Sequence, residues 1–97
     1  MANEFRIRFT LKTVKGFEPL CDFYIGNNRD IALSIFTQLE GNDEVGEADI
    51  LQLDFVEIRN GLPFNMKIKH CTLFQLTGNC RLITKEIFKY RNLMENF

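Results

Sequence analysis

The amino-acid sequence predicts an α+β fold in which two β-hairpins form a four-stranded, mainly antiparallel sheet with helices packed on one face, in a ββαββα-like order. Three observations predict this fold. Alternating apolar and polar residues recur in two pairs of runs, the dipeptide Asn60-Gly61 separates the second pair, and two further segments carry apolar residues at helical spacing. The 97 residues suffice for one core, so we predict a single α+β domain over residues 1–97.

The first hairpin is predicted from two alternating runs that flank a glycine. Matching their apolar faces places Phe9 opposite Phe23 and Leu11 opposite Cys21. This register requires an odd loop, Lys15-Gly16-Phe17, whose glycine supplies a left-handed backbone conformation.

A helix is predicted after the first hairpin. Asn27 or Asn28 can accept hydrogen bonds from the first free helix amides, and Asp30 suits the positive end of the helix dipole. Gly41 is expected to end the helix, and residues 42–48 to form an acidic flexible loop. The apolar residues at helical spacing are Ile31, Ala32, Ile35, Phe36 and Leu39.

The second hairpin is expected to turn at Asn60-Gly61, because a two-residue type I′ turn needs positive φ at both central positions. Folding the chain there pairs Arg59 with Leu62, sorts apolar from polar residues and brings opposite charges together. The further pairs expected are Phe55 with Met66, Leu53 with Ile68, Leu51 with His70, Asp54 with Lys67, and Gln52 with Lys69.

The C-terminal quarter is predicted to be helical in one or two pieces. Thr72 and Gln75 fit a capping box for a short first piece, which Gly78-Asn79 is expected to end. The apolar steps of 4, 3, 4 and 3 residues then favour a second helix, although the β-branched pair Ile83-Thr84 leaves a strand open as the alternative for residues 83–95. The residues at those steps are Ile83, Ile87, Tyr90, Met94 and Phe97.

Composition narrows the functional classes. A formal net charge of −1, from 12 basic and 13 acidic side chains, argues against nonspecific nucleic-acid binding. No apolar run approaches the roughly 18–20 residues of a membrane span, and the N-terminal MANEFR enters a strand pattern without an apolar signal-peptide region. The odd number of cysteines, without paired spacing, favours reduced thiols and a cytoplasmic location. They are Cys21, Cys71 and Cys80.

No catalytic residue, metal ligand or cofactor is predicted. His70 beside Cys71 is a candidate base–nucleophile pair, but adjacent strand residues point to opposite faces, and the expected register directs His70 toward the core beside Leu51. The cysteines and the histidine lack the paired spacing of zinc sites, and the acids of residues 40–49 do not match an EF-hand loop. The glycine patterns of phosphate-binding and dinucleotide-binding loops do not occur. We therefore expect no enzymatic activity.

The polar face of the predicted sheet is a candidate site for single-stranded nucleic acid or a small anionic ligand. Basic side chains beside an aromatic ring can hold phosphates and stack bases. Asp54 opposite Lys67, and Asp22 next to Arg8, are expected to neutralise part of that charge. The residues expected on this face are Arg6, Arg8, Lys12, Tyr24, Lys67 and Lys69.

An aromatic surplus favours a different function, an interaction surface. The chain has 10 phenylalanines, which either fill the core or leave aromatic surface exposed. Phe74, Phe88 and Phe97 are the candidates for exposure, and an open four-stranded sheet leaves two edges that invite pairing unless they are blocked. The leading interpretation is a cytoplasmic module that acts through protein–protein contacts, as a homodimer or with another protein.

Two segments also carry a resemblance. The runs FTLKTVKGF (residues 9–17) and RNGLP (residues 59–63) resemble segments of a group of small uncharacterised bacterial proteins. The similarity to this group covers nearly the whole chain. The resemblance implies a bacterial cytosolic protein and transfers no activity, cofactor or site.

Overall fold

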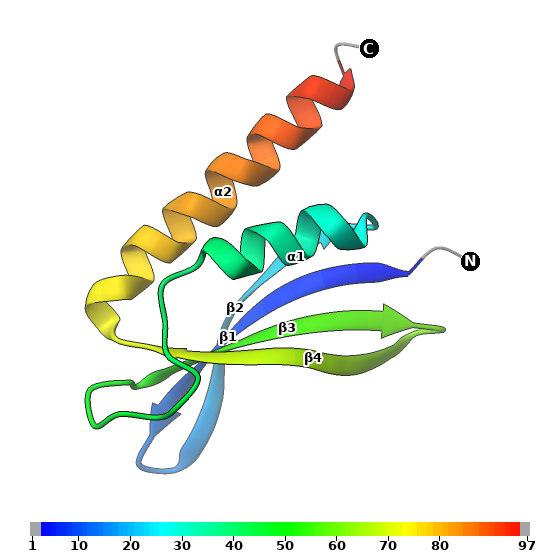
Figure 1. Ribbon diagram of the computed structural model, residues 1–97. Helices are drawn as coiled ribbons and strands as arrows, with labels where there is room; N and C mark the ends of the chain where they lie inside the picture. The colour runs from blue at the N-terminus through cyan, green and yellow to red at the C-terminus, as the bar shows by residue number, and fades with distance from the viewer. Residues whose placement is uncertain (1–2, 96–97) are drawn as a thin grey trace.

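The computed structural model describes the backbone of residues 3–95 and the side chains of residues 3–91. Four strands form one antiparallel sheet in the order β2-β1-β3-β4, and two helices complete the α+β fold that the sequence predicts (Figure 1). The elements are β1 (Glu4–Thr13), β2 (Gly16–Gly26), α1 (Arg29–Gln38), β3 (Leu51–Arg59), β4 (Leu62–Cys71) and α2 (Leu73–Glu95).

The first hairpin turns one residue earlier than expected. Thr13 pairs with Gly16, so the loop consists of residues 14–15 rather than residues 15–17. Gly16 follows this turn with φ +119, in the left-handed region that glycine adopts without strain. The prediction of a glycine in left-handed conformation at this turn is confirmed, and the predicted loop is wrong.

The register of the first hairpin also differs from the prediction. Phe9 pairs with Cys21 rather than with Phe23, and Leu11 pairs with Glu18 rather than with Cys21. The new turn and a β-bulge at Leu20 together move the pairing by two residues near Phe9. Beyond the bulge the shift is even, so Phe9, Cys21 and Phe23 keep their predicted face of the sheet, whereas the partner of Leu11 moves by three residues.

The second hairpin turns where the sequence predicts. Asn60 has φ +52 and Gly61 has φ +80, and Arg59 pairs with Leu62. This register holds as far as the pair Val56–Asn65. It then breaks at a β-bulge, where one extra residue of β4 lies between the partners of Val56 and Phe55.

The extra residue, Met66, reverses the faces of the rest of β4. The side-chain period of a strand is two, so a one-residue slip exchanges its two faces. The expected pairs beyond the bulge are therefore wrong. In the structure Phe55 pairs with Lys67, Asp54 with Ile68, Leu53 with Lys69, Gln52 with His70 and Leu51 with Cys71.

The bulged register has identifiable physical causes. It buries Cys71 completely and directs Lys69 toward the end of α1. It also lets His70 exchange two backbone hydrogen bonds of 2.8 Å with Asn42, which lies in the loop that follows α1. None of these partners is visible in the alternation of β4 alone.

Helix α1 starts as predicted and ends differently. The side chain of Asn28 accepts a hydrogen bond from the amide of Ile31 at 3.1 Å. At the other end the ammonium of Lys69 donates to the carbonyls of Phe36, Thr37 and Leu39 at 2.9–3.2 Å, so a lysine of β4 caps the helix. Gly41 is not the terminator; a Cβ there would lie 3.0 Å from the carbonyl oxygen of His70.

Helix α2 is continuous from Leu73 to Glu95, which settles the choice between helix and strand for residues 83–95. The capping box is confirmed, because Thr72 and Gln75 exchange hydrogen bonds of 3.0 and 3.2 Å. The predicted break at Gly78-Asn79 is wrong. Asn79 is buried inside the helix, where its amide bonds both backbone groups of Glu40 at 2.8 Å. The side chains of Met94 and Phe97 lie outside the described residues.

The core lies between the sheet and the two helices, and α2 crosses at an angle to α1 (Figure 1). Phe55 stacks against Phe5 at 5.8 Å and against Phe36 of α1 at 5.5 Å between ring centroids. Ile83 attaches α2 to the same cluster. The fully buried large side chains include Phe9, Phe36, Phe55, Ile7, Leu51, Leu53 and Ile83.

Candidate interaction surface

Four of the six residues expected on the polar sheet face lie there. Arg6, Arg8 and Lys12 alternate along β1 with its buried residues, and Tyr24 of β2 pairs with Arg6. The described helices pack against the other face, so this is the open face of the sheet. The expected pair of Phe9 with Phe23 would have set Tyr24 opposite Arg8, and the two-residue shift of the hairpin sets it opposite Arg6.

Lys67 and Lys69 leave this set. The bulge at Met66 places them opposite Phe55 and Leu53, on the face that carries the core. Lys69 caps α1 and lies over the ring of Phe36 at 5.1 Å, and burial lowers the pKa of its ammonium. The expectation that these lysines belong to the basic face is wrong.

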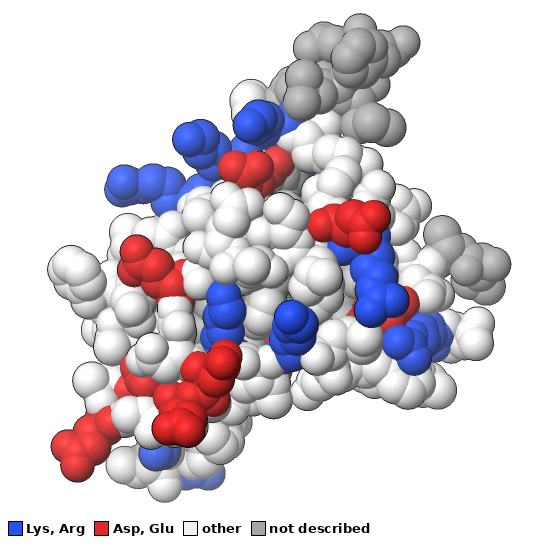
Figure 2. Space-filling view, in the orientation of Figure 1, with Lys and Arg blue, Asp and Glu red and all other residues white. Residues whose placement is uncertain are grey.

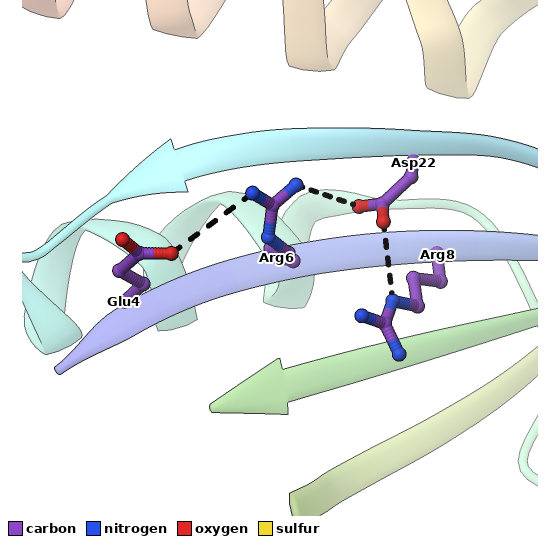
Figure 3. Close-up of polar contacts among 4 residues, drawn as sticks. All are labelled: Glu4, Arg6, Arg8 and Asp22. Atoms are coloured by element: carbon purple, nitrogen blue, oxygen red, sulfur yellow. Dashed lines mark hydrogen bonds and ion pairs between the residues drawn. The ribbon is translucent and has the colours of Figure 1, made fainter. Parts of the chain in front are cut away.

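The arginines of the open face are held by carboxylates. Asp22 of β2 lies opposite Arg8 and accepts a hydrogen bond from Arg8 at 3.2 Å and another from Arg6 at 3.5 Å. Glu4 lies 3.9 Å from Arg6 in the same row, as Figure 3 shows. Asp54 of β3 lies opposite Arg8 on its other side. The open face is therefore a cross-paired, nearly neutral surface rather than a basic one.

Tyr24 has a second cationic neighbour. The guanidinium carbon of Arg6 lies 5.5 Å from its ring centroid, and that of Arg91, near the end of α2, lies 5.7 Å away. Cation–π contacts of this kind attach α2 to the edge of the sheet. No pattern in the sequence links Arg91 to Tyr24, because the contact depends on the direction in which α2 runs.

The candidate base–nucleophile pair is not assembled. His70 is half-buried on the open face opposite Gln52, whereas Cys71 is buried opposite Leu51, so the expectation that His70 faces the core was wrong. Burial raises the pKa of the Cys71 thiol to about 11 and also raises that of Cys21 to about 11. Both thiols are therefore protonated near neutral pH and are weak nucleophiles.

Metal ligands do not gather into a site in the part of the chain that the structure describes. Within it, no three His, Cys, Asp or Glu side chains are close enough to share a metal ion. A groove of about 320 Å³ separates α1 from α2. Ile31, Ile35 and Tyr90 give it an apolar floor, while Asp30, Glu86 and Lys89 surround it with mixed charge.

Both edges of the sheet carry features that discourage strand pairing. The edge strand β2 contains Pro19 and two register irregularities, and the edge strand β4 contains Pro63 and the bulge at Met66. Asn42 also occupies the outer hydrogen-bonding groups of His70. Proline, bulges and coverage are the devices with which natural sheets block edge-to-edge association. Self-association through a sheet edge is therefore disfavoured.

The outward side of α2 carries large exposed side chains. Phe74 is 93% exposed and Phe88 is 69% exposed. They are separated by two heptads, and Arg81 and Lys85 lie on the same stripe between them. We call these four residues the outer face of α2. A shallow depression of about 480 Å³ lies along it, lined by Cys80, Arg81, Thr84, Lys85 and Phe88.

The loop between α1 and β3 is acidic. Residues 40–49 contain five acids and no basic residue, and we call them the acidic loop. Asp49 is buried and accepts a hydrogen bond from the amide of Gly46 at 2.8 Å, while Asn42 bridges to β4. The loop expected to be flexible is thus tied to the fold near both ends. Asp43, Glu44, Val45 and Glu47 are exposed.

Comparisons with protein-family models, curated proteins and solved structures found no match for this chain. Among the described residues, no helix is long and apolar enough to cross a membrane. The candidate interaction surface therefore rests on the geometry of the chain alone.

Proposed function

We propose that this chain is a non-enzymatic bacterial cytoplasmic module that acts through protein–protein contacts and associates with a second copy of itself. One observation carries the proposal. Phe74 and Phe88 are exposed on the outer side of a helix whose inner side is already packed on a complete core. Large aromatic side chains contribute most where an interface buries them.

The distribution of phenylalanine supports the same reading. The composition alone would also allow all 10 phenylalanines to fill the core. Instead, Phe17, Phe64, Phe74 and Phe88 are exposed by 43–93%, while Phe5, Phe9, Phe36 and Phe55 form the buried aromatic group. A monomer that exposed these rings permanently would carry an aggregation liability that a specific contact removes.

Sedimentation equilibrium tests this function. We expect the wild type to show a concentration-dependent dimer at micromolar concentrations, and Phe74→Ser with Phe88→Ser to shift the equilibrium to monomer. Val14→Ser is the matched control, because Val14 is fully exposed at the tip of the first hairpin, away from α2. A strictly monomeric wild type at high micromolar concentration would exclude self-association.

The alternative function, binding of single-stranded nucleic acid or a small anion on the open face, has weaker support. It retains Arg6, Arg8, Lys12 and Tyr24, but Asp22 and its neighbours already hold the arginines. It predicts that Arg6→Glu with Arg8→Glu weakens binding of a single-stranded oligonucleotide at low salt. An absence of binding by the wild type under those conditions would eliminate it.

A further inference from the structure

We propose that self-association joins the outer face of α2 in one copy to the acidic loop of the second copy, in a twofold dimer that contains this contact twice. The inference rests on the proposed self-association and names the two surfaces that carry it. Three features of the described residues lead to it: the charge of α2, the composition of the loop, and the position of the two on one side of the molecule.

The charge of α2 excludes the simplest dimer. Side chains 73–91 of the helix include four basic residues and one acidic residue. An antiparallel pair of outer faces would set Phe74 against Phe88 of the second copy, but it would also set Arg81 against Arg81 of the second copy, with a Lys85 side chain about one turn away on each side. Like charges opposed in an interface cost several kcal/mol. The outer face therefore fits an acidic partner with an apolar centre.

The acidic loop has that composition. Val45 is 59% exposed and lies among Asp43, Glu44 and Glu47, which are also exposed. Among the described residues, none of these carboxylates forms an ion pair, and neither do Arg81 and Lys85. The charges of Glu44, Glu47, Arg81 and Lys85 are thus available to a second molecule, whereas Asp43 interacts with the ammonium of Lys69. Val45 is of a size to enter the shallow depression beside Phe88, with carboxylates reaching the two basic side chains.

The position of the two surfaces allows one axis to satisfy both contacts. Asn79 of α2 holds the backbone of Glu40 at 2.8 Å, so the acidic loop starts beside the helix. Figure 2 shows basic side chains along α2 at the upper left and acidic side chains around the loop at the lower left. A twofold axis between these regions inverts the second copy, so each basic region meets an acidic one. The interface is isologous and closes as a dimer.

Reciprocal charge reversal tests the inference. One variant carries Arg81→Glu with Lys85→Glu, and the other carries Glu44→Lys with Glu47→Lys. Each variant alone opposes like charges in both contacts, so its dimer dissociation constant should rise at least about tenfold. In an equimolar mixture both contacts again join opposite charges, and a heterodimer should form with about the wild-type affinity. All four positions are exposed, so neither variant removes a core contact.

Native mass spectrometry distinguishes the heterodimer from either homodimer by mass. Arg29→Glu is the control, because it reverses an exposed charge at the start of α1, the end of that helix farther from the acidic loop, and should leave the dissociation constant unchanged. Rescue in the mixture supports the inference.

Other outcomes separate the two proposals. If the wild type and both reversed variants dimerise equally well, the inference is refuted and self-association stands. The same conclusion follows if the mixture of the two variants forms no heterodimer. A monomeric wild type would refute both. Binding of a monomeric wild type to anionic phospholipid vesicles, lost with Arg81→Glu and Lys85→Glu, would assign the outer face to a membrane and overturn the inference.

Discussion

Replacing Ile68 by alanine tests the register of the second hairpin. The unbulged register that the sequence predicts sets Ile68 opposite Leu53 in the core. In the structure Ile68 lies opposite Asp54 on the open face and is 42% exposed, whereas Leu53 is fully buried. Leu53→Ala is therefore the matched comparison, because both substitutions shorten a C4 side chain to a methyl group.

The expected magnitudes differ because only one site is enclosed. Leu53→Ala removes a buried isobutyl group and leaves a cavity, so it should lower the free energy of unfolding by about 2–5 kcal/mol. Full burial of an Ile side chain contributes about 1.5–3 kcal/mol, and Ile68 is only about half-buried with no cavity to leave. Ile68→Ala should therefore cost roughly 1 kcal/mol.

Urea denaturation followed by circular dichroism measures both free energies. An unchanged denaturant dependence in the two variants would show that they still unfold as the wild type does. We expect Leu53→Ala to move the midpoint at least twice as far as Ile68→Ala. Equal losses, in the range expected for a buried residue, would place Ile68 in the core and refute the bulge at Met66.

Three further predictions follow from the fold. Gly61→Val should lower the free energy of unfolding by about 1–3 kcal/mol, because a β-branched residue resists the positive φ of this turn; equal urea midpoints for variant and wild type would contradict that. Lys69→Met should cost about 1–3 kcal/mol and increase amide exchange at the end of α1, whose carbonyls lose their donor; unchanged exchange there would show that Lys69 does not cap the helix. The Arg59 guanidinium holds the pKa of the Glu57 carboxyl below its usual value of 4.5. The ionised carboxylate therefore stabilises the fold fully above pH 4.5, and this stabilisation is lost as the pH falls through the lowered pKa of the folded protein. Glu57→Gln should flatten this acid dependence in denaturation curves recorded from neutral to acidic pH, and an unaltered dependence would remove Glu57 as its cause.

The order and type of the elements follow from local patterns. Asn60-Gly61 predicts its turn because few dipeptides accept positive φ twice, and Asn28 caps α1 through its nearest free amides. Thr72 and Gln75 form their capping box for the same local reason. Each of these interactions spans at most three residues, so the sequence alone specifies it.

The bulge at Met66 has no local signal. Beyond Val56, unbulged pairing would give the apolar matches Phe55–Met66 and Leu53–Ile68, whereas the bulged register gives only Leu51–Cys71. Alternation therefore favours the unbulged register, and the observed choice depends on partners distant in the chain. Lys69 reaches the carbonyls of α1, and His70 pairs with Asn42. These contacts exist only once the helix and the acidic loop are in place. The bulge also changes the charge of the open face, because it removes Lys67 and Lys69 from that face.

The continuation of α2 through Gly78-Asn79 has a similar cause. Glycine and asparagine disfavour a helix interior, so their propensities predict an end there. Burial of the Asn79 amide against both backbone groups of Glu40 outweighs that preference. The continuous helix also brings Phe74 and Phe88 onto one stripe, which two separate pieces would not have done. The candidate interaction surface thus depends on tertiary contacts that sequence patterns do not display.

Native mass spectrometry of the purified wild-type protein tests the proposed function most directly, because one spectrum reports subunit number together with retained ligands. We expect a dimer whose mass is twice that of the chain, with no added metal ion or small molecule, and we expect the Phe74→Ser, Phe88→Ser variant to be monomeric. A monomer that retains a small molecule would contradict it and would direct attention to a binding site within a single chain.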